Sequence, residues 1–279
     1  MKMLFIGDVF GRPGRDLVRR ALPLLAGQYD IALTIANVEN AASGAGITRD
    51  SGDALLSYGI DVMTTGNHVW DKREALAYAG AEPRLLRPIN MAAGVPGRGS
   101  LVARAATGAP VGVINAMGRV FMAPIDNPFA AVGAEVERLR GECRFIVVDF
   151  HAEATAEKVA MGSYLDGKVT AVVGTHTHVP TADARVLRGG TAYVTDVGMT
   201  VPHDSIIGVE REAAMGRFVT GLPARFEPAS GDQRLQAVVI TADDATGLAT
   251  AIERIDWTVD DIVRAGREAG HGQDGDDKD

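Results

Sequence analysis

The chain has 279 residues, of which 46% are hydrophobic, and this is enough to bury the core of one large or two smaller α/β domains. Its formal net charge of −8 and pI near 5.3 argue against broad binding to nucleic-acid backbone, so we expect no stable nucleic-acid partner. The single cysteine, Cys143, excludes an internal disulfide and suits a reducing cytoplasm. We find no signal-peptide pattern and no apolar run near the roughly 18 residues of a membrane span. We therefore expect a soluble, cytoplasmic protein with no membrane contact.

Near-continuous apolar runs alternate with amphipathic segments from the N-terminus to about Val173. Such runs are typical of strands covered on both faces, and their alternation with helices predicts βαβ units. The expected strands are Met3–Ile6, Ile31–Ala36, Val62–Thr65, Val111–Asn115, Phe145–Phe150 and Val169–Val173. The expected helices are Asp16–Leu22, Thr48–Tyr58, Lys72–Tyr78, Pro128–Leu139 and Thr155–Tyr164.

The pattern changes from Gly189 onward. Short strands are expected at Thr191–Thr195, Arg217–Leu222 and Gln236–Thr241, and Leu248–Ile255 follows a turn in a way that predicts a hairpin. These segments predict a second, more antiparallel sheet. We expect one domain over residues 1–264, followed by a disordered acidic tail over residues 265–279, which has little apolar surface.

Residues of the types that bind metals follow several of the expected strands. The carboxyl ends of neighbouring parallel strands converge on one crevice, so residues far apart in the sequence can share one pair of ions. The pattern therefore predicts a two-metal hydrolase site. Its candidate residues are Asp8, Glu39, Asn40, Asn67, His68, His151, His176 and His178.

Each motif also has an ordinary explanation when taken alone. Asp8 could merely cap a helix, and His68 could be a hydrogen-bonded structural histidine. The strongest local motif is His176-x-His178, because this spacing at a strand end puts both rings on the same side. Incidental histidines in an exposed turn are its alternative. The recurrence of such residues at separate strand ends favours the metal site.

In their order along the chain, Gly7-Asp8, Gly66-Asn67-His68, His151 and Gly174-Thr175-His176-Thr177-His178 resemble the signature of calcineurin-like metallophosphoesterases. The runs around them resemble the YmdB-like branch, and the resemblance extends from Met1 to about Ile255. It implies a layered α/β fold of two mixed β-sheets packed together and flanked by helices. The runs that resemble this branch are Gly7–Arg12, Asn37–Ala42, Thr65–Asp71 and Thr195–Met199.

The chain departs from the wider superfamily at two positions. Phe10 stands where a histidine is usual, and Glu39 stands where the bridging ligand is usually an aspartate. The resemblance implies that Asn40 replaces the missing histidine, so that the first metal uses Asp8, Glu39, Asn40 and His178. It implies that the second metal uses Glu39, Asn67, His151 and His176. Oxygen and nitrogen ligands without a thiolate suit two divalent ions such as iron or manganese, and they do not exclude zinc or magnesium.

The resemblance implies a phosphodiesterase that hydrolyses cyclic nucleotides, including 2′,3′-cyclic nucleotides, by attack of a metal-bound hydroxide with His68 as general acid. Two alternatives stay open: a phosphomonoesterase or phosphoprotein phosphatase, and a metal-stabilised, regulatory, RNA-associated binding protein. A homo-oligomer is also suggested, with a small-molecule phosphodiester as substrate. Four rings could stack on a base or could serve only for core packing: Phe10, Trp70, Phe121 and Phe129. Arg12 and Arg119 could contact phosphate or could be solvated loop residues.

Overall fold

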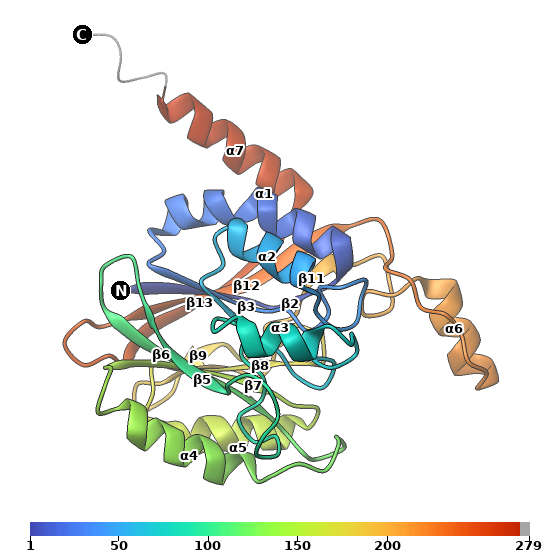
Figure 1. The fold of residues 1–279 in the computed structure, drawn as a ribbon. Coiled ribbons are helices and arrows are strands. Elements are labelled where there is room, and N and C mark those ends of the chain that lie inside the picture. The colour runs from blue at the N-terminus through green and yellow to red at the C-terminus, as the bar shows by residue number, and fades with distance from the viewer. Residues whose placement is uncertain (274–279) are drawn as a thin grey trace.

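The computed structural model describes residues 1–273, and within them the strands form two mixed β-sheets (Figure 1). The strands of the first sheet are β1 (Lys2–Ile6), β2 (Asp8–Val9), β3 (Leu33–Asn37), β4 (Val62–Thr64), β11 (Met199–Pro202), β12 (Gln233–Ala242) and β13 (Ala249–Thr258). Their order is β2-β11-β12-β1-β3-β4, and β13 pairs with β12. β1, β3 and β4 run parallel, whereas β12 is antiparallel to β1.

The strands of the second sheet are β5 (Ser100–Arg104), β6 (Pro110–Met117), β7 (Phe145–His151), β8 (Ala171–Thr175), β9 (Arg185–Val186) and β10 (Ala192–Val194). Their order is β5-β6-β7-β8-β10-β9, and the central strands β6, β7, β8 and β10 are parallel. A shared apolar cluster lies between the two sheets, with Phe5 and Ile35 from the first and Val113 and Val147 from the second. The near-continuous apolar strands follow from this double covering.

Helices cover the outer faces of both sheets (Figure 1). The helices are α1 (Gly11–Tyr29), α2 (Arg49–Ser57), α3 (Ala75–Ala81), α4 (Pro128–Leu139), α5 (Thr155–Leu165), α6 (Arg211–Thr220) and α7 (Val259–Gln273). α1 and α2 lie over the first sheet and α4 and α5 lie under the second. The layered α/β architecture predicted from the sequence is therefore confirmed.

The strands after Gly189 do not form a sheet of their own. The predicted hairpin is present as β12 and β13, but both strands belong to the first sheet, where β12 pairs with β1 over Lys2–Ile6. β10 instead extends the second sheet beside β8. The expected antiparallel sheet is thus wrong, because pairing across more than 200 residues of sequence was not visible in the local pattern.

The strand expected at Arg217–Leu222 is also wrong, because α6 includes Arg217 to Thr220. The β-branched and aromatic residues Phe218, Val219 and Thr220 favour a strand locally, but they continue a helix that starts at Arg211. The helix ends at Gly221, whose φ of 71° is left-handed and whose N–H donates to the Arg217 carbonyl at 2.8 Å. Tertiary context has overridden local propensity here.

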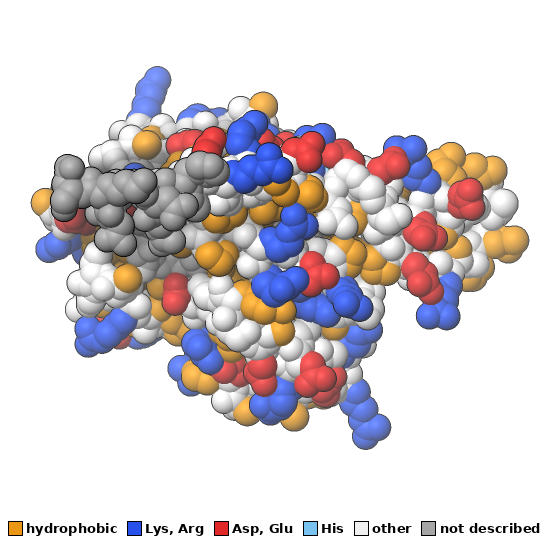
Figure 2. Space-filling view, turned by 90° about the horizontal axis from the view of Figure 1, so that it is seen from above, with side chains coloured by type: hydrophobic (Ala, Val, Ile, Leu, Met, Phe, Trp, Pro, Cys, Tyr) orange, Lys and Arg blue, Asp and Glu red, His pale blue; other side chains and the backbone are white. Residues whose placement is uncertain are grey.

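α6 belongs to a segment that projects from the body of the protein (Figures 1 and 2). Of the helix residues only Ala214 is buried. On α6 and directly after it, the exposed large apolar side chains are Met215, Phe218, Val219 and Leu222.

The tail expected from residue 265 begins inside a helix. α7 starts with reciprocal hydrogen bonds between Thr258 and Asp261, and it buries Ile262 in the cluster that contains α1 residues. It continues to Gln273, and the rest of the expected tail, residues 274–279, lies outside the described residues. No helix within residues 1–273 combines the length and the apolar character that crossing a membrane requires.

Candidate metal centre

The carboxyl ends of β1, β3, β4, β7 and β8 converge and bring the predicted ligands together. His151 is the last residue of β7, and His176 directly follows β8. Asp8 opens β2, while Asn67 lies in the turn after β4. All seven predicted ligands take part in one set of contacts, described below. They are Asp8, Glu39, Asn40, Asn67, His151, His176 and His178.

Oxygen and nitrogen atoms that could bind a metal ion gather around Nε2 of the buried His151. Glu39 Oε1 and Asn67 Oδ1 each lie 2.9 Å from this nitrogen, and His176 Nδ1 lies 3.1 Å from it. Glu39 Oε1 is fully buried, yet it has no hydrogen-bond partner of acceptable geometry among the described residues. A buried carboxylate oxygen without such a partner is costly unless a cation compensates it. The arrangement therefore fits a metal ion, and these four residues are the predicted ligands of the second metal.

The other predicted ligands form an adjoining group around Asp8. His178 Nε2 lies 3.5 Å from Asp8 Oδ1, and Asn40 Nδ2 lies 3.3 Å from the same oxygen and 3.2 Å from His178 Nε2. A half-turn of the Asn40 amide would present its oxygen at this position instead. The backbone N–H of His176 donates to Asp8 Oδ2 at 3.3 Å, which joins the two groups.

Burial and mutual charge set the protonation of these groups. Burial raises the pKa of Asp8 and of Glu39, but the histidines His178 and His151 outweigh it and lower both. Burial lowers the pKa of His178, but Asp8 outweighs it and raises this pKa to about 9. Burial and the neighbouring His151 lower the pKa of His176 to about 4. Both carboxylates are thus ionised at neutral pH and balanced by histidine protons, a role that a divalent cation also fills.

A buried network behind His151 fixes which of its nitrogens faces the centre. Thr175 Oγ1 donates to Asp149 Oδ1 at 2.7 Å and therefore accepts from His151 Nδ1 at 2.9 Å. Asn37 also donates to Asp149, at 3.1 Å. Burial raises the pKa of Asp149 to about 6, which still leaves it ionised at neutral pH. With Nδ1–H donated to Thr175, His151 turns Nε2 toward the other predicted ligands, and this nitrogen would bind a metal ion after releasing its own proton. Sequence reasoning missed this network.

The loop that carries His176 and His178 is held in an unusual backbone conformation. Both residues have positive φ, 98° and 64° respectively. Thr177 between them donates to Asp196 Oδ2 through its N–H at 3.1 Å and its hydroxyl at 2.7 Å. The same oxygen accepts from Lys158 Nζ at 2.7 Å, and both charged side chains are buried. Asp196 lies in a run that resembles the YmdB-like branch, but Lys158 in the middle of α5 gave no signal in the sequence.

Gly66 is required by the close approach of its turn to His151. A Cβ atom at this position would lie 2.0 Å from His151 Cδ2. No side chain can be accommodated without displacing the imidazole, so the Gly66-Asn67 pair lets Asn67 reach the centre.

His68 lies at the rim rather than among the predicted ligands. Its side chain is 42% exposed, and its Nδ1 lies 2.7 Å from Asp71 Oδ2. Its backbone N–H donates to Glu39 Oε2 at 2.8 Å, which ties the residue to the centre. Since Asp71 occupies Nδ1, the Nε2 atom remains for contact with a substrate.

Most of the other residues considered for substrate contact have different surroundings. Phe10 is buried with its ring edge against His178, Trp70 packs on the core, and Phe129 packs against Phe150 in the second sheet's outer cluster. Arg12 is exposed beside Asp16. Only Phe121 among the four rings is almost fully exposed.

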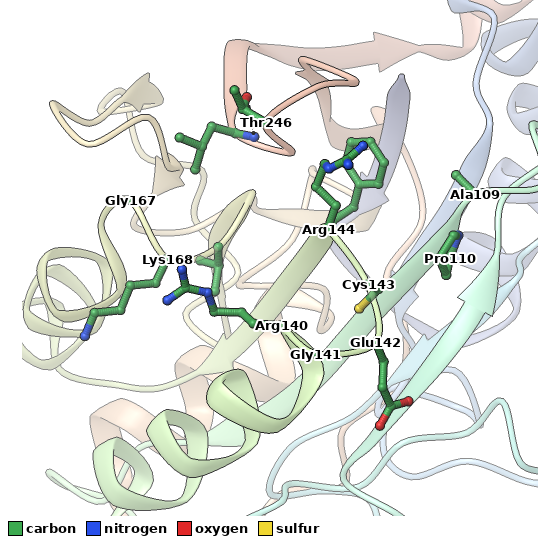
Figure 3. A pocket seen from close by; sticks show the side chains of 13 residues that line it. Ala109, Pro110, Arg140, Gly141, Glu142, Cys143, Arg144, Gly167, Lys168 and Thr246 are labelled. Carbon is green, nitrogen blue, oxygen red and sulfur yellow. Dashed lines mark hydrogen bonds between the residues drawn. The ribbon is translucent and has the colours of Figure 1, made fainter.

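A cavity of about 610 Å³ lies at the end of the second sheet that is opposite to the predicted metal ligands (Figure 3). It is lined by Arg140, Arg144 and Lys168 around Cys143, beside Phe145 at the start of β7. His151 is at the other end of the same strand. This cavity is therefore separate from the metal centre.

Known proteins are similar to this chain over nearly its whole length. The model of the YmdB-like protein family matches residues 4–255. The chain belongs to the YmdB-like family. A YmdB-like relative from Bacillus subtilis, named 2′,3′-cyclic-nucleotide 2′-phosphodiesterase, is 49% identical over 255 residues, which cover 91% of this chain and 96% of the relative.

Two solved structures are similar over nearly their whole length. A hypothetical protein from Thermus thermophilus has a TM-score of 0.86 at 43% identity, covering 92% of this chain and 99% of that protein. A phosphatase from Mycoplasma pneumoniae has a TM-score of 0.86 at 34% identity, covering 92% and 93%. The YmdB-like chain thus has the metallophosphoesterase fold that the sequence predicted.

Proposed function

We propose that this chain is a dinuclear metal-dependent phosphodiesterase that hydrolyses cyclic nucleotides, including 2′,3′-cyclic nucleotides. The observation that carries the proposal is the gathering of Glu39 Oε1, Asn67 Oδ1 and His176 Nδ1 within 3.1 Å of His151 Nε2, where Glu39 Oε1 is buried without a hydrogen-bond partner of acceptable geometry among the described residues. The name of the Bacillus subtilis relative supports the substrate class.

The donor set divides into two overlapping groups that share Glu39. Asp8, Glu39, Asn40 and His178 would hold one ion, and Glu39, Asn67, His151 and His176 would hold the other. Oxygen and nitrogen donors without a thiolate fit iron or manganese. When bound, two such cations neutralise phosphate oxygens and supply a nucleophile near neutral pH.

The chain's own groups prepare the centre for this chemistry. Thr175 and Asp149 hold the His151 tautomer, and Asp196 holds Thr177 so that His176 and His178 keep their positions. These contacts would hold the ligand atoms in position before a substrate arrives.

In this proposal His68 acts as the general acid. Asp71 accepts a hydrogen bond from Nδ1, which orients the ring. The proton on Nε2 would pass to the ribose oxygen as the P–O bond breaks. His68 is a neighbour of Asn67 and is tied to Glu39 by its backbone, so the transfer would take place beside the phosphate.

The leaving group provides the sharpest test of this role. His68→Ala, with both metals bound, should lose roughly 10²- to 10⁴-fold in kcat on 2′,3′-cyclic AMP, the usual contribution of a general acid. The loss should be much smaller on bis-p-nitrophenyl phosphate, because p-nitrophenolate departs without a proton. His203→Gln, outside the centre, is the matched control. Equal losses on both esters would contradict the assignment.

A phosphomonoesterase is the second candidate, and the phosphatase from Mycoplasma pneumoniae among the similar structures favours it. Activity of the metal-loaded protein confined to p-nitrophenyl phosphate, with neither 2′,3′- nor 3′,5′-cyclic AMP turned over, would support this interpretation. No turnover of any ester by the fully metal-loaded protein would favour a metal-stabilised binding protein instead.

We also propose that the chain forms a homo-oligomer and acts in the cytoplasm. The exposed side chains Met215, Phe218, Val219 and Leu222 on and just after α6 support self-association, because a projecting apolar surface is stabilised when a partner covers it. Sedimentation equilibrium of the intact chain tests the first part: a single monomeric species at micromolar concentration would contradict it.

A further inference from the structure

The loop between β6 and α4 begins directly beside the metal centre. Met117, the last residue of β6, is the strand partner of His151, and the next N–H, from Gly118, donates to the His151 carbonyl at 2.9 Å. Three residues of chain extend at most about 10 Å. The backbone of Phe121 therefore lies within about 10 Å of Gly118, at the end of the sheet where His151 lies.

This loop is fixed at both ends. The buried Asn90 donates through Nδ2 to the carbonyls of Met117 at 2.8 Å and Asp126 at 2.9 Å, which closes the loop. The Glu157 carboxylate accepts the N–H groups of Arg119 and Val120 at 3.2–3.3 Å. These contacts hold the loop at both ends.

Phe121 has two unfavourable features within this fixed loop. Its side chain is 89% exposed, although a phenyl ring is stabilised by burial. Its φ is 61°, in the left-handed region that aromatic residues rarely adopt. Strain of this kind persists when the surrounding structure imposes it, and it clusters at ligand-binding sites. The ring is held out into solvent rather than packed on the core.

We propose that Phe121 stacks on the nucleobase of the substrate and so determines its specificity for nucleotides over other cyclic phosphodiesters. This inference rests on the proposed phosphodiesterase function. A base attached to a ribose whose phosphate lies at the metal centre needs an apolar face nearby, and aromatic rings supply it by stacking. Phe10, Trp70 and Phe129 are engaged in packing, so Phe121 is the one of these four candidate rings that is exposed enough to stack on a base.

The test compares esters with and without a base. The substrates are 2′,3′-cyclic AMP and the 2′,3′-cyclic phosphate of 1-O-methylribose, and the variants are Phe121→Ala and Phe121→Trp. Loss of base stacking lowers affinity by an amount that corresponds to about 5- to 150-fold. Phe121→Ala should lower kcat/KM by this factor on the nucleotide only, and Phe121→Trp should keep the nucleotide activity. Val120→Ala, which shortens the neighbouring exposed apolar side chain in the same loop, is the matched control and should change neither.

Calorimetry provides a readout that does not depend on turnover. Phe121→Ala should weaken the binding of adenosine 3′-monophosphate to the metal-loaded protein and leave the binding of inorganic phosphate unchanged. Equal effects on both ligands, or on both esters, would overturn the stacking role, as would no effect at all. If the wild type hydrolyses neither ester, the proposed function fails, and the calorimetric comparison still decides whether Phe121 binds a base.

Discussion

The buried ion pair between Asp196 and Lys158 offers a quantitative test of how the histidine loop is held. Asp196→Asn removes the charge that compensates Lys158, which is 1% exposed and donates to Asp196 Oδ2 at 2.7 Å. It also weakens the acceptor for the N–H and hydroxyl of Thr177. Leaving one member of a buried pair without its partner costs about 3–5 kcal/mol.

This cost is large enough to measure in a chain of 279 residues. At roughly 2–4 °C per kcal/mol for chains of this size, Asp196→Asn should lower the melting temperature of the metal-free protein by about 6–20 °C. The double variant Asp196→Asn/Lys158→Met has no buried charge left to compensate, so most of the stability should return. Metal affinity should stay about 10- to 100-fold low in both variants, because Thr177 no longer has a charged acceptor between the two ligand histidines.

Calorimetric melting of chelator-treated samples and metal titration of the same variants measure the two quantities separately. Lys158→Met alone completes the double-mutant cycle. The reasoning is refuted if Asp196→Asn melts within about 2 °C of the wild type, a shift that corresponds to at most about 1 kcal/mol. It is also refuted if the double variant loses the sum of the two single losses.

Three further predictions concern the centre itself. Gly66→Ala should abolish binding of the second metal, because the new Cβ would lie 2.0 Å from His151 Cδ2. The metal content of the variant after gel filtration measures this binding, and full occupancy of both sites would contradict the prediction. Chelation should leave the secondary structure seen by circular dichroism unchanged but lower the melting temperature, because ligand carboxylates then lose a compensating cation. The unfolding free energy of metal-free protein should fall as pH rises from about 6.5 to about 9, since the proton that His178 shares with Asp8 is bound more tightly in the folded state. Urea titrations at each pH measure the unfolding free energy, and in His178→Gln its fall between about pH 6.5 and pH 9 should be smaller by the contribution of His178.

The sequence alone predicted those features that depend on the local pattern of apolar and polar residues. The parallel strands were visible as apolar runs because both of their faces are covered, and the polar residues at their ends marked the crevice where Asp8, Asn67 and His151 lie together. Family resemblance then divided the residues between two metals. That division stays a prediction, whereas their proximity is a feature of the structure.

Features that depend on distant partners were not accessible in the same way. The pairing of β1 with β12 joins the two ends of the chain, and the strand propensity of Phe218 and Val219 gave no indication of the helix that contains them. Lys158 and Asp149 are buried charged residues whose role depends on partners elsewhere in the chain. The capping residues Thr258 and Asp261 of α7, by contrast, were a local signal for a helix start that could have been recognised.

The central claim is that two ions share Glu39 at the carboxyl ends of these strands. The most direct measurement is an anomalous difference map from crystals of the manganese-loaded protein. The account predicts two peaks about 3.5–4 Å apart, the spacing of two-metal hydrolase sites, with Asn67, His151 and His176 bound to one and Asp8 and His178 to the other. A single peak, or peaks away from Glu39, in crystals of fully loaded protein would contradict it.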